Sequence, residues 1–298
     1  RGMWMLGTAE YPLFLCKADH DATIFEGGVG SMGPVILRQL TELGVSHKMV
    51  SQVVITHAHP DHVMAVPLFQ ETFSPLSVIG SGAAAATLSV EKAVSFFEKI
   101  DGALTASLLK MGRITEAHRP KPLEEKRIAV DRVVTEGDTI AVDGFSFQVL
   151  HTPGHSDCSL SFHDAGRRVL IVSDATGYYM PAHDDFWPDY FTGFSAYLAS
   201  IERLWALDAE VLCLGHHGTV KGAEAVTSHL QSAIGAARQY HARIVEETQA
   251  GKPPRDIAEQ LGTEVFEKSP LLPVDFFQKN CSLLVKQSLS HEGITMDK

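Results

Sequence analysis

The chain has 298 residues, of which 45% are hydrophobic and 20% are charged, so it can bury one large core. Its formal net charge of −11, together with the lack of any run rich in Lys and Arg, excludes a broad surface for nucleic-acid phosphates. An apolar run long enough to cross a membrane, about 18 residues or more, does not occur, and no membrane partner is expected.

The four cysteines bear on the cellular compartment. Cys16, Cys158, Cys213 and Cys281 lie far apart and form no C-x-x-C pair. This spacing favours neither a zinc knuckle nor a disulfide framework. Residues 1–4 show no pattern of a secretory signal. We therefore predict a cytoplasmic protein.

Three short strands are expected near the start of the chain, over residues 3–6, 12–17 and 22–25. A turn that begins at Glu26 and contains Gly27 and Gly28 leads into an amphipathic helix over residues 33–43. Because this turn lacks the lysine of a P-loop and the spacing of a dinucleotide-binding turn, we do not expect it to bind phosphate.

The most informative stretch follows an apolar strand expected over residues 53–55. His57 and His59 are two residues apart, so at an extended strand end their side chains share one side. Asp61 and His62 follow the proline turn and can point at a neighbouring position. Imidazole and carboxylate suit Zn²⁺, Fe or Mn, and four such groups in six residues would be costly to bury without a cation. The stretch predicts two metal half-sites.

The next segment is expected to form a helix over residues 63–73 and a strand over residues 76–79. Apolar residues then recur every three or four positions over residues 91–114, which predicts either a helical hairpin broken near Gly102 or one long helix. This insertion is either a packing element or a cap over the metal site.

The second half of the chain repeats the order of strand and ligand. Strands are expected over residues 128–134, 139–142, 145–150, 159–162, 169–172 and 211–214, with a hairpin turn at Asp143 and Gly144. His155 follows one of these strands within T-P-G-H and is a third ligand for the first metal. Asp174 follows another, and its two oxygens can bridge two metals. His216 completes the ligand set of the second metal and is favoured over His217 for this role.

The residues outside the predicted metal ligands are expected to have structural or substrate-contacting roles. His151 lies inside a strand end and is expected to be structural. The aromatic-rich residues 178–194 are expected to form an irregular loop, either a wall of the substrate pocket or a contact in a homodimer. Helices are expected over residues 195–207 and 223–248 and again from residue 254 on.

The order of these ligands resembles that of the metallo-β-lactamase superfamily over about residues 3–232. The resemblance implies an α+β fold, the four-layer αβ/βα sandwich, in a domain of residues 1–232 with a helical insertion at about residues 89–125. A helical C-terminal extension, residues 233–298, would pack on the same body. The implied ligands are His57, His59 and His155 for metal one, Asp61, His62 and His216 for metal two, and Asp174 as the bridge.

Details of the sequence look nearest to the branch of the quinolone-signal response thioesterase and glyoxalase II. Shared features are the Glu26 turn, the helical insertion and the G-H-S-D stretch that contains His155. Two positions depart from the family: many members carry Asp at the position of Glu26, and D-H-x-G-G reads D-H-V-M-A here. His59 favours a hydrolase over flavo-diiron oxidoreductases, which carry Glu at this position.

The expected function is hydrolysis of a small-molecule acyl substrate, most simply a thioester, ester or lactone. Two divalent ions, Zn²⁺ first with Fe or Mn as alternatives, would hold a bridging water and lower its pKa to about 7, giving a hydroxide that attacks the acyl carbonyl. Asp61 would also orient this nucleophile, and His183 is a conceivable proton donor. The alternatives are a metal-containing regulatory or binding protein with little turnover, and a di-iron redox protein.

Overall fold

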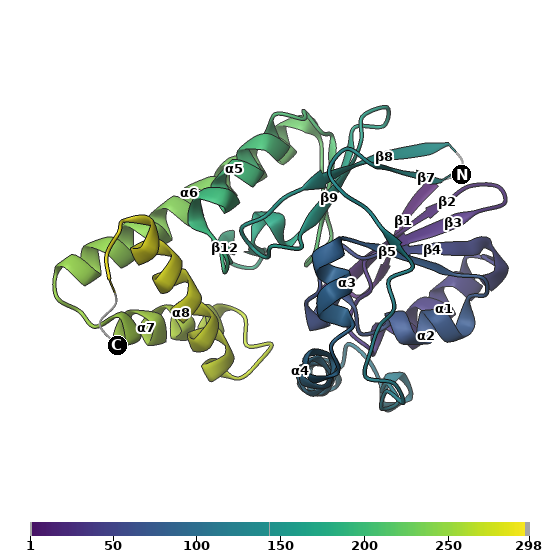
Figure 1. Ribbon diagram of the computed structural model, residues 1–298, viewed down its shortest axis with the longest axis horizontal. Helices are drawn as coiled ribbons and strands as arrows, with labels where there is room; N and C mark the ends of the chain where they lie inside the picture. Colours follow the sequence, from purple (N-terminus) through teal and green to yellow (C-terminus); the bar gives the residue numbers. More distant parts are fainter. Residues whose placement is uncertain (1, 143, 296–298) are drawn as a thin grey trace.

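The structure is a computed structural model that describes residues 2–142 and 144–295. Two six-stranded sheets face each other, and helices cover their outer sides (Figure 1). The expected α+β sandwich is confirmed. The expected hairpin turn at Asp143 and Gly144 includes Asp143, which lies outside the described residues.

The first sheet is built entirely from the first part of the chain, in the order β1-β2-β3-β4-β5-β6. The first three strands pair antiparallel, and β3, β4, β5 and β6 pair parallel. Its strands are β1 Gly2–Gly7, β2 Pro12–Lys17, β3 Ala22–Phe25, β4 Val50–Val54, β5 Ser77–Gly80 and β6 Arg132–Val133. The strand expected over residues 128–134 is therefore much shorter than predicted.

The second sheet follows in the chain, with the order β14-β13-β10-β9-β8-β7. All neighbours pair antiparallel except β10 and β13, which are parallel. Its strands are β7 Thr139–Val142, β8 Phe145–His151, β9 Leu160–Asp164, β10 Val169–Ser173, β13 Val211–Leu214 and β14 Thr219–Lys221. The last of these, β14, was not predicted.

Three layers of buried side chains hold the sandwich together. Between the sheets, the ring of Phe25 packs at 4.8 Å from that of Phe147 and 5.2 Å from that of Phe162. The outer face of the first sheet packs on α1 Met32–Glu42 and α2 Val66–Thr72. The outer face of the second sheet packs on α5 Phe194–Trp205 and α6 Ala223–Gln249.

The insertion between β5 and β6 contains α3 Gly82–Leu88, which was not predicted, and α4 Glu91–Lys110. Of the two forms expected for this region, the structure has the single long helix. Gly102 does not interrupt α4, because a lone glycine in a helix costs only about 1 kcal/mol and the packed apolar face of α4 outweighs it.

The C-terminal helices α7 Pro254–Lys268 and α8 Val274–His291 pack against α5 and α6 in one apolar cluster with the second sheet. The boundary expected after residue 232 falls inside the continuous helix α6. None of the helices in the described part of the chain is both long enough and apolar enough to span a lipid bilayer. The four cysteines are buried and form no disulfide.

The aromatic segment differs from the irregular loop that was expected. Tyr178–Met180 and Asp185–Trp187 form a small antiparallel hairpin, β11 and β12. Trp187 and Tyr190 are buried in the cluster that contains α5, α6, α7 and α8. The aromatic side chains of this segment are therefore largely covered by the helices of the same chain.

Candidate metal centre

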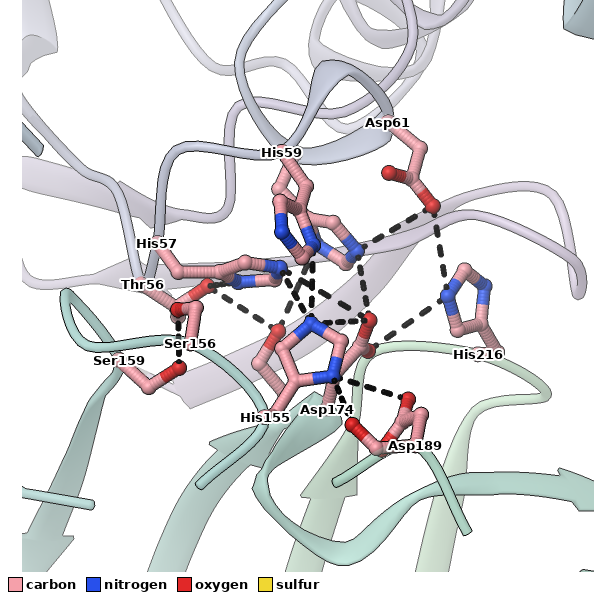
Figure 2. Close-up of polar contacts among 12 residues, drawn as sticks. Thr56, His57, His59, Asp61, His155, Ser156, Ser159, Asp174, Asp189 and His216 are labelled. Carbon is pink, nitrogen blue, oxygen red and sulfur yellow. Dashed lines mark hydrogen bonds and ion pairs between the residues drawn. The ribbon is translucent and has the colours of Figure 1, made fainter. Parts of the chain in front are cut away.

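Seven potential metal ligands meet where strands of both sheets end (Figure 2). The first sheet supplies four of them just after β4, and the second sheet supplies His155 after β8, Asp174 after β10 and His216 after β13. Asp61 and His62 belong to the short 3₁₀ turn Pro60–His62, which follows the end of β4 at Val54. The repeated order of strand and ligand therefore brings distant residues together.

The first group consists of His57, His59 and His155. The Nε2 atom of His155 lies 3.2 Å from Nε2 of His57 and 2.9 Å from Nδ1 of His59. Three nitrogens bound to one tetrahedral Zn²⁺ at about 2.05 Å would lie roughly 3.3 Å apart. The spacing of these nitrogens therefore fits a single cation.

The second group consists of Asp61, His62, His216 and Asp174. Oδ2 of Asp61 lies 3.4 Å from Nε2 of His62 and 3.5 Å from Nε2 of His216. These separations are also those of ligands around one cation.

Asp174 lies between the two groups. Its Oδ2 is 3.3 Å from Nε2 of His62 and 3.6 Å from Nε2 of His155, while its Oδ1 is 3.5 Å from Nε2 of His216. One carboxylate thus faces donors of both groups. This position is the one that a bridging ligand would occupy.

The donor set fits a pair of cations on two further observations. His62 Nε2 and Asp174 Oδ1 are buried and have no hydrogen-bond partner among the described residues, and such atoms are costly unless something else binds them. Burial lowers the pKa of His57 well below its usual value, and it lowers that of His59 to about 3. Both imidazoles are therefore neutral, which is the form that binds metal.

Burial and charge act against each other on the acidic ligand Asp61. Burial raises the pKa of its carboxyl, but the neighbouring His62 and His216 more than offset this and hold the pKa at about 2. Asp61 is therefore a carboxylate at any pH at which the protein would work.

A second layer of residues fixes the orientation of the imidazoles. His62 Nδ1 donates to the Glu26 carboxylate at 2.9 Å, and His216 Nδ1 donates to the Glu10 carbonyl at 2.8 Å. His155 Nδ1 donates to the Asp189 carbonyl at 3.2 Å and lies 3.1 Å from Oδ2 of the same residue. Each bond leaves Nε2 free to face the cluster. These three partners could not be recognised as orienting groups from the sequence, because they lie 34 to 206 residues away from the histidines they contact.

The chain around the centre holds unusual backbone conformations. Glu26, Ser173 and His217 are non-glycine residues with φ of 80°, 50° and 61°. Such conformations cost about 1–3 kcal/mol each and persist where surrounding contacts fix them. Gly215 is also constrained, since a Cβ there would lie 2.1 Å from Oδ1 of Asp174.

The remaining histidines lie outside the two groups. His151 is exposed, and its Nε2 contacts the Asp157 carbonyl at 3.0 Å, in keeping with a structural role. His217 pairs through Nε2 with the Tyr178 hydroxyl at 2.9 Å, whereas His216 joins the cluster. His183 lies exposed in the turn between β11 and β12 and belongs to neither group, so the structure does not support it as a proton donor.

Curated proteins offer distant relatives of this chain. A hydroxyacylglutathione hydrolase from Fuscovulum blasticum is 26% identical over 235 residues, which cover 78% of this chain and 74% of the relative. The acyl-coenzyme A thioesterase MBLAC2 from Gallus gallus is 27% identical over 158 residues, which cover 52% of this chain and 50% of the relative.

One solved structure has a fold similar to that of this chain over almost the whole length of both proteins. A metallo-beta-lactamase family protein from Thermus thermophilus superposes with a TM-score of 0.67 at 20% identity, covering 98% of this chain and 94% of the other. The family model described as the metallo-beta-lactamase superfamily matches residues 13–216, which include every member of the two donor groups. The chain therefore belongs to the metallo-beta-lactamase superfamily.

Proposed function

We propose that this protein is a dinuclear-metal hydrolase that cleaves the acyl bond of a small thioester, ester or lactone. The observation that carries the proposal is the position of Asp174, whose two carboxylate oxygens face donors of both groups. In the proposal His57, His59 and His155 hold one cation, Asp61, His62 and His216 hold the other, and Asp174 is shared. Zn²⁺ is the first choice, with Fe and Mn as alternatives, because imidazole and carboxylate suit all three.

Bound divalent cations would lower the pKa of water and polarise the substrate carbonyl. The chain itself determines from which side a substrate approaches. His59 and Asp61 are partly exposed, whereas the other five donors are buried. A substrate would therefore reach the centre on the side of these two residues. The Asp61 carboxylate, anionic and on this open side, would accept a hydrogen bond from the attacking water and orient it.

The leaving group favours a thioester within this class. A simple thiol has a pKa of about 8.5, so a thiolate can depart without a strong general acid. His183, the donor considered from the sequence, lies in an exposed turn and belongs to neither donor group. The names of the two curated relatives, a hydroxyacylglutathione hydrolase and an acyl-coenzyme A thioesterase, support an acyl substrate.

The test is to remove a donor and to measure metal and turnover together. Asp174→Asn and His59→Ala should each lower both the bound metal and the hydrolysis of a panel of thioesters, esters and lactones. His20→Ala is the matched control, because this histidine is exposed and lies outside the donor groups. Unchanged turnover in Asp174→Asn would refute the proposal. Metal-loaded protein that is inert on the whole panel would instead support a binding or regulatory role.

A further inference from the structure

A second cluster of side chains that could hold a metal ion lies away from the sheet ends, where α8 meets α6. His241 belongs to α6, His291 is the last residue of α8, and Glu292 caps that helix. Oε1 of Glu292 lies 3.1 Å from Nε2 of His241 and 3.9 Å from Nε2 of His291. All three donor atoms lie within 4.8 Å of one another. Figure 1 shows the end of α8 beside α6.

Neighbouring side chains hold both imidazoles with Nε2 directed at the carboxylate. The ring of Phe194 stacks on that of His241, with centroids 4.0 Å apart and planes 12° apart. The same phenylalanine ring contacts His291 edge-on at 5.2 Å. His291 Nδ1 and the Ser195 hydroxyl are 2.9 Å apart, so Nδ1–H can donate there while Nε2 keeps its lone pair.

The position of Glu292 at a helix end favours a positive partner. It lies at the C-terminal end of α8, where the carbonyl groups give the helix a partial negative charge. A carboxylate is disfavoured there, and a cation beside it would offset this cost. Two imidazoles and one carboxylate form a ligand set that zinc enzymes use, with water in the fourth position. His291 and Glu292 are each 41% exposed, which leaves room for that water and a path for the ion.

We propose that His241, His291 and Glu292 form a separate binding site for Zn²⁺ or a similar divalent transition-metal ion, which fastens the end of α8 to α6. This site is independent of the hydrolase function proposed above. The ion would fix a helix that also contacts the segment next to the dinuclear centre. Gln287 on α8 donates to the Phe191 carbonyl at 3.0 Å. Phe191 lies two residues after Asp189, which orients His155.

The first measurement is the number of zinc ions bound by the full chain after removal of metal by a chelator and titration with Zn²⁺ alone. The wild-type chain should bind about three zinc ions: two at the dinuclear centre and one at the site formed by His241, His291 and Glu292. His241→Ala and His291→Ala should each bind about one ion fewer, while His20→Ala, which changes an exposed histidine elsewhere, should bind as many as the wild type. Equal numbers in the wild type and in both variants would overturn the proposal.

The second measurement locates the ion independently of the dinuclear centre. Zn²⁺ should slow amide hydrogen exchange in the last turn of α8 in the wild type and in Asp174→Asn, because that change lies in the other cluster. In Glu292→Gln, which keeps the shape of the side chain but loses its charge, the effect of Zn²⁺ should shrink severalfold. Exchange in α8 that is the same with and without Zn²⁺ in the wild type would also overturn the proposal.

Discussion

The Glu26 carboxylate and the His62 imidazole form a fully buried pair, in which Nδ1 donates to Oε2 at 2.9 Å. The Thr56 hydroxyl also donates to this carboxylate. Glu26 keeps its position in a left-handed backbone conformation, φ 80°, that costs free energy for a non-glycine residue. The strain is offset by contacts that orient a candidate metal ligand from the turn before α1.

Glu26→Gln should weaken metal binding by about 10- to 100-fold, the usual cost of losing an orienting partner behind a histidine ligand. The amide can still accept from His62 Nδ1, but it lacks the charge that makes the imidazole a better ligand. Competition with a chromophoric chelator measures the affinity. Glu116→Gln is the matched control, because Glu116 pairs with Arg119 on the surface. Equal affinities in the two variants would contradict the assigned role of Glu26.

Gly215→Ala should disturb Asp174 without removing any donor. The new Cβ would lie 2.1 Å from Oδ1 of Asp174, so the carboxylate has to move. Metal content and turnover should both fall at least tenfold, since a displacement of about 1 Å at such a site can cost about 100-fold. Gly235→Ala on α6 has no atom within 4 Å of its new Cβ and should leave both unchanged. Full metal content in Gly215→Ala would show that Asp174 is not held there.

Asp101 on α4 should make stability depend on pH. Burial raises the pKa of its carboxyl from 3.8 to about 7, although the Gly30 N–H donates to it. The folded state therefore binds the proton more tightly than the unfolded state. The resulting stabilisation is complete below about pH 4 and is lost as the pH rises through about 7, at about 1.4 kcal/mol per pKa unit.

Asp101→Asn removes this proton and keeps an oxygen for the Gly30 N–H. Urea unfolding of metal-free protein should show that the variant gains free energy of unfolding relative to the wild type as the pH rises from about 4 to about 7, by a few kcal/mol at most. Glu91→Gln, which changes an exposed carboxylate in the first turn of the same helix, serves as the control. A constant difference between Asp101→Asn and the wild type over this range would contradict the prediction.

Tyr190→Phe should loosen α8. The Tyr190 hydroxyl lies 2.9 Å from that of Ser288, and both residues are fully buried. Removing one hydroxyl leaves the other unpaired, which costs about 1–3 kcal/mol. Denaturant unfolding should show this loss, and the double variant with Ser288→Ala should recover part of it. Additive losses in the double variant would mean that the two hydroxyls are not coupled.

Much of the metal cluster could be predicted because most of its residues follow a recognisable pattern, a potential ligand directly after an apolar strand. His57, His155, Asp174 and His216 each come just after an apolar strand, and strand ends on one side of a sandwich meet. The orienting residues carry no such mark. Asp189 lies two residues after β12, a strand of only three residues, and Glu10 contributes a backbone carbonyl, so neither the residue type nor the spacing indicates a role.

The elements that could not be predicted from the sequence are those without an apolar period. Helix α3 is rich in alanine and buries only two of its residues, so no amphipathic pattern marks it. Strands β11 and β14 have three residues each, too short for an alternation to stand out. Gly102 was a possible break, yet the tertiary contacts of α4 keep the helix continuous.

The order of the strands divides the donors of the metal cluster between two consecutive parts of the chain. Every strand before residue 134 lies in one sheet, and every strand of the other six-stranded sheet comes after residue 138, so the chain crosses between them once. The cluster takes four donors from the first half and three from the second. Two fragments divided at this crossing would each carry an incomplete set of donors. Binding of the cations would then require both fragments and would stabilise their association.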